Sequence, residues 1–248
     1  MVPEGSHVRS VYLTPETGVF ATDLSSKLLI DCSTIDTATS LAVRDQIAEK
    51  YPSASFYDAP VSGGVLGAQK ATLTIMIGCD EKDPKFPLLK DLLGMLGASI
   101  FACGGPSFGL TAKLCNNYCS GLISLATSEA FNIGIRSGMD PRVLANVFST
   151  STAQSCVADK WNPVPGLCPE APASHGYKGG FKVQLMRKDF GLAVDTAERV
   201  GAKLMLGAAG LRTYTEAMND PRCKDLDSRV VYRYIGGKED WAQEFDPK

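Results

Sequence analysis

An α/β domain followed by an all-helical region is the fold class that this 248-residue sequence predicts. In residues 1–105, short apolar runs alternate with segments of helical periodicity, which is the pattern of a sheet built from strand–helix units. After Pro106 the strand signals stop, and apolar residues recur at steps of three and four. We therefore expect one domain over residues 1–105 with a parallel sheet, and a second domain over residues 106–248 made of helices.

The first domain is expected to alternate strands with helices. "KLLIDCST" is a short apolar run that ends in Asp, Ser and Thr, as a buried parallel strand does at its carboxyl end. The helix that follows has Thr37 as a candidate N-terminal cap. The expected strands cover residues 27–34, 55–61, 71–79 and 98–105, and the expected helices cover residues 37–51 and 83–96.

The second domain is expected to begin with one long helix over residues 108–137, ended by Gly138. Asp140 and Pro141 start the next helix, which runs to about Ser149. Residues 161–181 hold four prolines and four glycines and are expected to form a loop; loops of that length are usually functional or mobile. Further helices are expected at about 182–199, 203–218 and 225–235.

Composition excludes several classes of protein. The net charge of −2 gives no basic surface for nucleic acid, and no apolar run approaches the roughly 20 residues that span a bilayer. The first 20 residues lack the features of a targeting segment. The eight cysteines form no CxxC pair and there are two histidines, so a zinc cluster is not expected. We expect reduced thiols that serve mostly as small core residues.

The stretch "GLTAKLCNNYCSG" places polar residues along one side of the long helix. The stripe has one cation and several neutral hydrogen-bonding groups, which suits a ligand cleft; it consists of Lys113, Asn116 or Asn117, Ser120 and Ser124. Burial lowers the pKa of a lysine and lets it exchange a proton near neutral pH. The alternative is a polar seam wetted by solvent.

Two strand ends carry candidate ligand contacts. In "DAPVSGGVLGA", the Ser62-Gly63-Gly64 turn lets backbone N–H groups approach an anion such as a carboxylate, although it could also be a plain strand–helix turn. In "DCSTI", Ser33 and Thr34 could contact a cofactor, because ligands of open α/β sheets bind at the carboxyl ends of strands. Serine and threonine are also common helix caps at such positions.

The remaining charged candidates are less informative. Lys188 and Asp189 lie in an apolar helical pattern, where such a pair more often has a surface or structural role than a ligand contact. His7 in the opening loop and His175 in the Pro/Gly-rich loop are not obvious catalysts, and no GxSxG motif accompanies them.

Together these segments resemble the β-hydroxyacid dehydrogenase family. The resemblance rests on "LLIDCSTID", "DAPVSGGVLGAQKATLTIMIG", "GLTAKLCNNY", "EAFNIGIRSGMDP", "NPVPG…GYKGGF" and "LMRKDFGLA", and it covers nearly the whole chain. It implies a Rossmann-type domain, here only its C-terminal part, followed by a helical domain that pairs with a second subunit. The "NPVPG…GYKGGF" loop favours the members that act on 3-hydroxyisobutyrate over the tartronate-semialdehyde and glyoxylate/succinic-semialdehyde reductases.

The resemblance also implies a role for each candidate residue. Lys113 would be the general acid/base on the substrate hydroxyl. The substrate would be held by Ser62, Gly63 and Gly64 at its carboxylate and oriented by Asn117, with Asn116 as its neighbour. The residues implied near the nicotinamide cofactor are Val2, Pro3, Thr34, Lys188 and Asp189.

The implied reaction is oxidation of 3-hydroxyisobutyrate to methylmalonate semialdehyde with NAD, a step of valine degradation in mitochondria. A desolvated lysine suits this chemistry, because the hydroxyl proton needs a base while hydride leaves the carbon. NADP stays open as the cofactor, and a related substrate stays open as well. A further alternative is a non-catalytic remnant retained for dimerisation or for binding a small acid. No metal, nucleic acid or membrane partner is implied.

One departure from the family is large. The family begins with a strand, a G-x-G-x-x-G turn and a helix that bind the pyrophosphate, and no such motif occurs in residues 1–248. We therefore expect about half of the nucleotide-binding sheet to be absent, whether through a truncated gene model, a splice form or a fragment. The sheet should then have an unpaired edge and an uncovered apolar face, and the chain should bind dinucleotide poorly.

Overall fold

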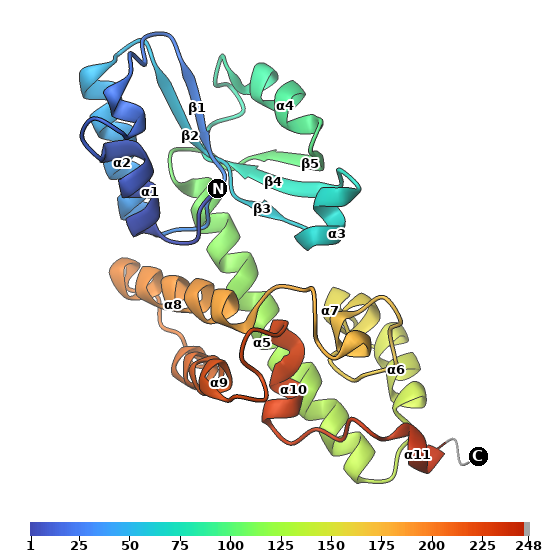
Figure 1. Cartoon of the computed structure of the whole chain (residues 1–248). Coiled ribbons are helices and arrows are strands. Elements are labelled where there is room, and N and C mark those ends of the chain that lie inside the picture. The colour runs from blue at the N-terminus through green and yellow to red at the C-terminus, as the bar shows by residue number, and fades with distance from the viewer. Residues whose placement is uncertain (246–248) are drawn as a thin grey trace. The chain divides into compact units, whose positions relative to one another are not determined.

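The computed structural model describes residues 1–245. They fall into two compact units, Met1–Asn116 and a second unit that begins at Asn117. The long helix α5 (Phe108–Arg136) begins in the first unit and continues into the second (Figure 1). The first unit contains parallel strands and helices, and the second is helical, which confirms the predicted fold class. The predicted boundary near residue 105 stays a prediction.

The first unit contains two small sheets (Figure 1). β1 and β2 pair in parallel, as do β4 and β5, whereas β3 and β4 are antiparallel. The bounds are β1 Leu28–Asp31, β2 Ser55–Asp58, β3 Val61–Ser62, β4 Leu73–Ile77 and β5 Gly97–Ala102.

The single strand expected over residues 55–61 is interrupted at Pro60. A proline has no N–H to donate to a neighbouring strand, so a regular strand does not continue through it. The Pro60 carbonyl still accepts from Met76 N at 3.0 Å, and the chain then pairs with β4 as the short antiparallel strand β3. The expectation of one strand over residues 55–61 is therefore wrong, because the segment forms β2 and the antiparallel strand β3. The two sheets stay joined, because Gly78 N donates to the Asp58 carbonyl at 2.8 Å.

Four helices accompany the strands of the first unit: α1 (Gly5–Leu13), α2 (Thr37–Lys50), α3 (Gly64–Gln69) and α4 (Phe86–Gly94). The placement of His7 in an opening loop is wrong, because it lies in α1. Val8 and Tyr12, one helical turn apart, are buried against α2 and β2 and hold α1 in place. The N-terminal cap of α2 is Asp36, which accepts from Thr39 N at 2.7 Å, rather than Thr37.

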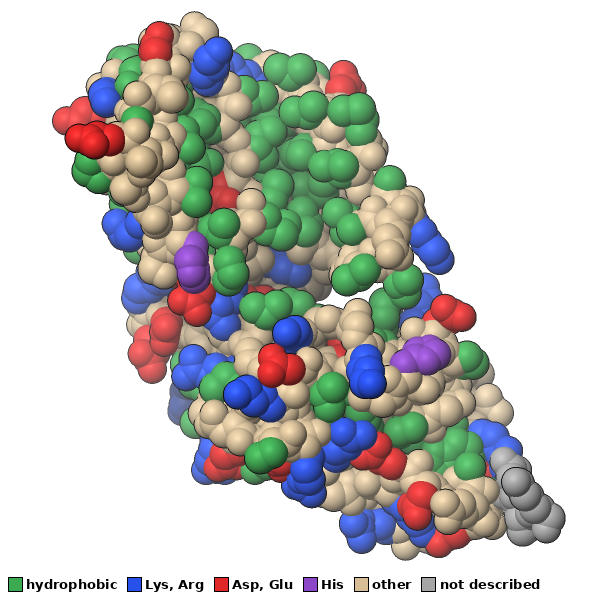
Figure 2. All heavy atoms as spheres, in the orientation of Figure 1, with side chains coloured by type: hydrophobic (Ala, Val, Ile, Leu, Met, Phe, Trp, Pro, Cys, Tyr) green, Lys and Arg blue, Asp and Glu red, His purple; other side chains and the backbone are tan. Residues whose placement is uncertain are grey.

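The first unit leaves apolar surface uncovered. Figure 2 shows hydrophobic side chains gathered over its strands and the neighbouring helix. Leu89 and Leu93 are the buried side of α4, but apolar residues on the other side of α4 and just after it are exposed, namely Leu88, Leu92, Met95 and Leu96. Within residues 1–245, β1 pairs only with β2, so its other edge has no strand beside it. Both features agree with the uncovered face and unpaired edge expected from the sequence.

In the second unit, helices pack around the part of α5 that follows Asn117. Its helices are α6 (Pro141–Thr150), α7 (Cys156–Lys160), α8 (Val183–Val200), α9 (Gly207–Asn219), α10 (Val231–Tyr234) and α11 (Ala242–Phe245). The helix expected over 225–235 is shorter, consisting of a 3₁₀ turn at Ser228–Val230 followed by α10. Another 3₁₀ turn of the second unit lies at Pro172–His175. The first unit has one at Val19–Ala21.

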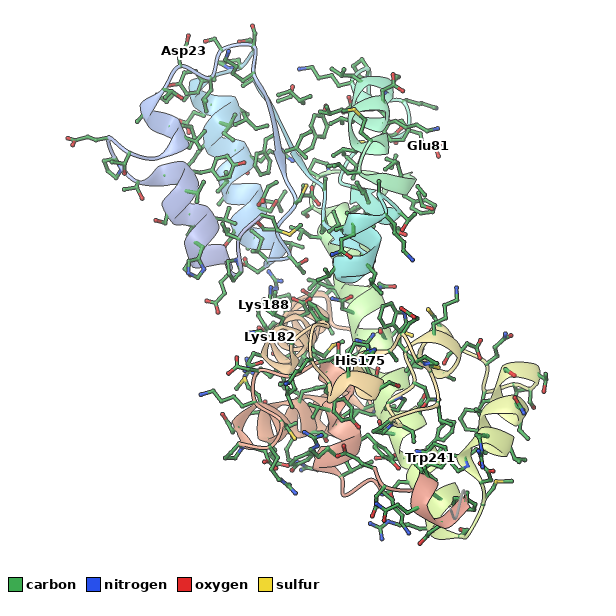
Figure 3. The ribbon with its side chains drawn as sticks, turned by 45° about the vertical axis from the view of Figure 1, so that its right-hand side comes forward. Asp23, Glu81, His175, Lys182, Lys188 and Trp241 are labelled. Atoms are coloured by element: carbon green, nitrogen blue, oxygen red, sulfur yellow. The ribbon has the colours of Figure 1, made fainter. Side chains whose placement is uncertain are left out.

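Buried polar contacts hold the Pro/Gly-rich loop of residues 161–181 against the core. The Tyr177 hydroxyl donates to the Pro163 carbonyl at 2.8 Å, and Trp241 Nε1 donates to the Pro165 carbonyl at 2.8 Å. Tyr177 is fully buried. His175, in the 3₁₀ turn of this loop, and Trp241 are labelled in Figure 3. The loop is therefore a packed part of the second unit.

The eight cysteines are all free, in agreement with reduced thiols. Only Cys79 and Cys223 are buried, and burial raises the pKa of each thiol to about 11. Cys115, Cys119 and Cys156 are exposed, so the expectation that the cysteines serve mostly as core residues is wrong.

Candidate active site

Lys113 lies in the second turn of α5 and is 7% exposed. It is therefore not the solvated surface charge that the sequence left open. Removing an ammonium group from water is costly unless it is paired or loses its proton. The role of Lys113 in proton transfer stays a prediction.

The polar stripe of α5 divides into two parts. Farther along the helix, Ser124 Oγ donates to the Ser120 carbonyl at 2.9 Å and Ser128 Oγ to the Ser124 carbonyl at 2.7 Å. These hydroxyls are engaged by the backbone of their own helix, as serines in helices often are. The ligand chemistry expected of the stripe is thus concentrated at Lys113 and Asn117, which are both buried.

Asp58, at the end of β2, holds the start of α5. Its Oδ1 accepts from Ser107 N at 2.8 Å and its Oδ2 accepts from Leu110 N at 2.9 Å. The residue is 3% exposed, and burial raises the pKa of its carboxyl, although the two N–H donors oppose that shift. Sequence reasoning missed Asp58. Its only signal was an acidic residue at a strand end, which does not reveal a helix start some 50 residues away.

The Ser62-Gly63-Gly64 turn follows β3. Gly63 and Gly64 have φ of 135° and 63°, values that favour glycine, and both residues are exposed. The turn and the start of α5 both lie against β4: Ser62 pairs with Thr74, while a Cβ at Gly109 would come within 2.2 Å of the Met76 carbonyl. The structure thus attaches the glycine turn and the helix that carries Lys113 to one strand of the first unit.

The turn after β1 brings together two of the segments expected at the cofactor. Ser33 Oγ donates to Asp31 Oδ1 at 2.6 Å and accepts from Val2 N at 2.9 Å. Ser33 is 1% exposed, so it holds the opening segment in place and is not itself open to a ligand. Val2 and Thr34 are half-buried and Pro3 is exposed. The structure therefore places the Val2–Pro3 segment beside Ser33, which directly precedes Thr34.

In the second unit, Asp189 of α8 connects two candidate residues. Asn117 Nδ2 donates to Asp189 Oδ2 at 2.6 Å, and Lys188 Nζ lies 3.0 Å from Asp189 Oδ1. Figure 3 shows Lys188 on α8. Because a carboxylate only accepts, it fixes which end of the Asn117 amide faces it. Asp189 is 1% exposed, whereas Asn116 is exposed.

Two family models match the two parts of the chain. Residues 1–105 match the NAD-binding domain of 6-phosphogluconate dehydrogenase, and residues 108–235 match the NAD-binding domain of NADP-dependent 3-hydroxyisobutyrate dehydrogenase. A probable mitochondrial 3-hydroxyisobutyrate dehydrogenase of Dictyostelium discoideum is 45% identical over 95% of this chain and 71% of its own length. The chain belongs to the 3-hydroxyisobutyrate dehydrogenase family. Members of this family are NAD(P)-dependent oxidoreductases.

Other members give the same result. The 3-hydroxyisobutyrate dehydrogenase of Pseudomonas aeruginosa is 39% identical over 96% of this chain and 79% of its own length. A solved structure of the Mycobacterium tuberculosis enzyme with L-serine has a TM-score of 0.83 and 34% identity, covering 95% of this chain and 77% of that one. Several eukaryotic relatives are named mitochondrial and the bacterial one is not.

The described residues fit the family's cofactor in part. Val2 is hydrogen-bonded to Ser33, which follows β1 and precedes Thr34, and ligands of such sheets bind at strand ends. No glycine-rich phosphate turn of the G-x-G-x-x-G kind occurs in the sequence to hold the pyrophosphate. Among residues 1–245, no three metal-ligating side chains gather into a cluster. None of the helices in that range combines the length and apolar composition needed to cross a bilayer.

Proposed function

We propose that this chain oxidises 3-hydroxyisobutyrate to methylmalonate semialdehyde with NAD, using Lys113 as the general acid/base. The observation that carries the proposal is a buried lysine on a helix whose start is hydrogen-bonded to Asp58, the residue of β2 from which the chain leads through β3 into the Ser62-Gly63-Gly64 turn. An amine that can exchange a proton at one point and exposed glycine backbone at another suit a substrate with a hydroxyl group at one end and a carboxylate at the other.

Each residue has a defined part in the proposed reaction. The amides and hydroxyl of Ser62, Gly63 and Gly64 bind the carboxylate, and the amide of Asn117 orients the substrate. The neutral amine of Lys113 accepts the hydroxyl proton, and in the reverse direction its ammonium group returns that proton. The developing alkoxide is stabilised by the same positive charge. When bound, the nicotinamide accepts the hydride that leaves the carbon.

In the first unit, the cofactor would be held at its nicotinamide end by Val2, Pro3 and Thr34. For Lys188 and Asp189 of the second unit, the resemblance alone favours a place near the cofactor. Asp189 pairs with Lys188 at 3.0 Å. The sequence has no G-x-G-x-x-G turn, so we expect NAD to bind this chain more weakly than micromolar. NAD is favoured over NADP by the resemblance alone.

The substrate class is supported by one relative. L-Serine, present in the Mycobacterium tuberculosis structure, is itself a small acid with a hydroxyl on the third carbon. We propose the same class for this chain. We also propose that a second copy pairs through the helical domain of residues 106–248, and that the protein acts in mitochondria, as the names of its eukaryotic relatives suggest.

The test is NAD-dependent oxidation by the 248-residue chain at millimolar NAD, with 3-hydroxyisobutyrate compared with glycerate. We expect NADH formation with 3-hydroxyisobutyrate that falls about 10²- to 10⁴-fold in Lys113→Ala, the usual contribution of a general acid/base. The matched control is Lys90→Ala, which removes an exposed lysine of α4. Binding of the hydroxy acid with no oxidation in the unmodified chain would favour the alternative of a non-catalytic remnant. Preference for glycerate would assign a related reductase activity.

A further inference from the structure

We propose that Asp58 is a positioning residue for this reaction, which fixes Lys113 relative to the Ser62-Gly63-Gly64 turn. This inference rests on the proposed function. Asp58 does not reach the substrate in this account; it acts on the backbone of the two segments that do.

Both carboxyl oxygens of Asp58 are used at the start of α5. Oδ1 accepts from Ser107 N at 2.8 Å and Oδ2 from Leu110 N at 2.9 Å. These N–H groups lie at the helix start, where they have no carbonyl partner within the helix. One buried carboxylate therefore satisfies two backbone donors at once and sets where the helix begins.

Close packing leaves the helix start little freedom to shift. A Cβ at Gly78 would lie 1.9 Å from Asp58 Oδ1. A Cβ at Gly109 would lie 2.2 Å from the Met76 carbonyl and 2.9 Å from Asp58 Oδ2. Real Cβ atoms do not approach other atoms this closely, so only glycine fits at both places. The carboxylate is therefore packed against the backbone of Gly78 and Gly109.

Asp58 stands where the two functional segments meet. Along the chain, it directly precedes Ala59 and Pro60, which lead through β3 into the glycine turn. Across space, it contacts Leu110, and Lys113 follows Leu110 by about one helical turn. A change at Asp58 therefore alters the separation between the lysine and the turn. Misplacement of reacting groups by about 1 Å can reduce a rate roughly 100-fold.

The experiment measures binding of L-serine and 3-hydroxyisobutyrate to the 248-residue chain by calorimetry. For Asp58→Asn, which keeps the shape but replaces one acceptor by a donor, we expect affinity to fall about 10- to 100-fold. The matched control is Asp83→Asn, since Asp83 also accepts from a backbone N–H, that of Lys85 at 2.8 Å, in the same unit. The control should bind within about twofold of the unmodified chain. Equal affinity in Asp58→Asn would overturn the inference.

A second measurement needs no variant. Saturation with L-serine should slow amide hydrogen exchange at Ser107 and Leu110 several-fold. If the Asp58 hydrogen bonds to these amides position the binding site, a ligand bound there stabilises them. Unchanged exchange at these two amides under saturation would contradict positioning, even if Asp58→Asn fails to fold. Failure of the unmodified chain to bind either acid would instead overturn the proposed function. The two failures are therefore distinguishable.

Discussion

The two units differ in the kind of side chain that fills their buried cores. In the second unit, large aromatic residues are fully buried, among them Phe131, Tyr177, Tyr214 and Tyr232. In the first unit, the fully buried side chains are aliphatic, such as Ile35, Ile75 and Leu89. Yet the first unit carries Lys113, the glycine turn and the Val2–Pro3 segment. These segments therefore lie in a unit with an aliphatic core, where polar contacts such as those of Asp58 help to position them.

Removing the Asp58 side chain is expected to give the largest stability effect outside the apolar cores. Asp58→Ala leaves the amides of Ser107 and Leu110 buried without their acceptor, so we expect a loss of about 2–3 kcal/mol in unfolding free energy. The comparison variant is Asp140→Ala, which removes the half-buried cap of α6 in the second unit. Urea unfolding of both should show a clearly smaller loss for Asp140→Ala. Equal losses of unfolding free energy in the two variants would mean that the buried Asp58 contributes no more to stability than the cap of α6.

In the second unit, a buried hydroxyl should affect stability but not ligand binding. Tyr177→Phe removes the hydrogen bond to the Pro163 carbonyl and is expected to cost about 1–2 kcal/mol. Because Tyr177 belongs to the core that holds the Pro/Gly-rich loop, affinity for L-serine should stay unchanged. Thermal unfolding and calorimetry on the same variant test both parts. Weaker binding would show that the loop takes part in the site.

The pH dependence of stability should report on Asp58. Burial raises the pKa of this carboxyl above 3.8, so the native state holds its proton to higher pH than the unfolded state does. Its contribution to stability is therefore fully present below pH 3.8 and is lost as pH rises through the folded-state pKa. Unfolding free energies of the unmodified chain and of Asp58→Asn, measured across this range, should differ most at the acidic end. A difference that grows with pH would contradict this direction.

The smallest expected effect concerns the uncovered face of the first unit. Leu92→Glu places a charge on the exposed side of α4 and should change the unfolding free energy by no more than about 0.5 kcal/mol. It should reduce self-association of the chain, because exposed apolar patches promote it. Light scattering against concentration measures this, with Lys90→Glu as a control for added negative charge. Equal reduction by the control would mean that charge, not the apolar face, controls association.

Much of the fold could be predicted because each element carries its own periodic signal. The long helix expected over 108–137 is α5 at Phe108–Arg136, and the helix expected over 37–51 is α2 at Thr37–Lys50. Helix α1 was missed, because its burial rests on Val8 and Tyr12, which meet partners far along the chain. The antiparallel strand β3 was missed for a similar reason, since its pairing with β4 is a tertiary contact.

The candidate site was only partly readable from the sequence. The helical stripe identified Lys113 and left Asn116 and Asn117 as alternatives, and only burial separates the exposed Asn116 from the buried Asn117. Asp58 could not be found from spacing, because its partners, Ser107 and Leu110, lie 49 and 52 positions away. Local patterns thus reveal which residue types are present, whereas the network that holds them depends on contacts between distant segments.

The most direct test is a crystal structure of this chain with 3-hydroxyisobutyrate bound. We predict that Lys113 Nζ lies about 3 Å from the substrate hydroxyl while the backbone amides of Gly63 and Gly64 bind its carboxylate. A bound acid whose hydroxyl lies away from Lys113, or a Lys113 ammonium directed into bulk water, would contradict the account.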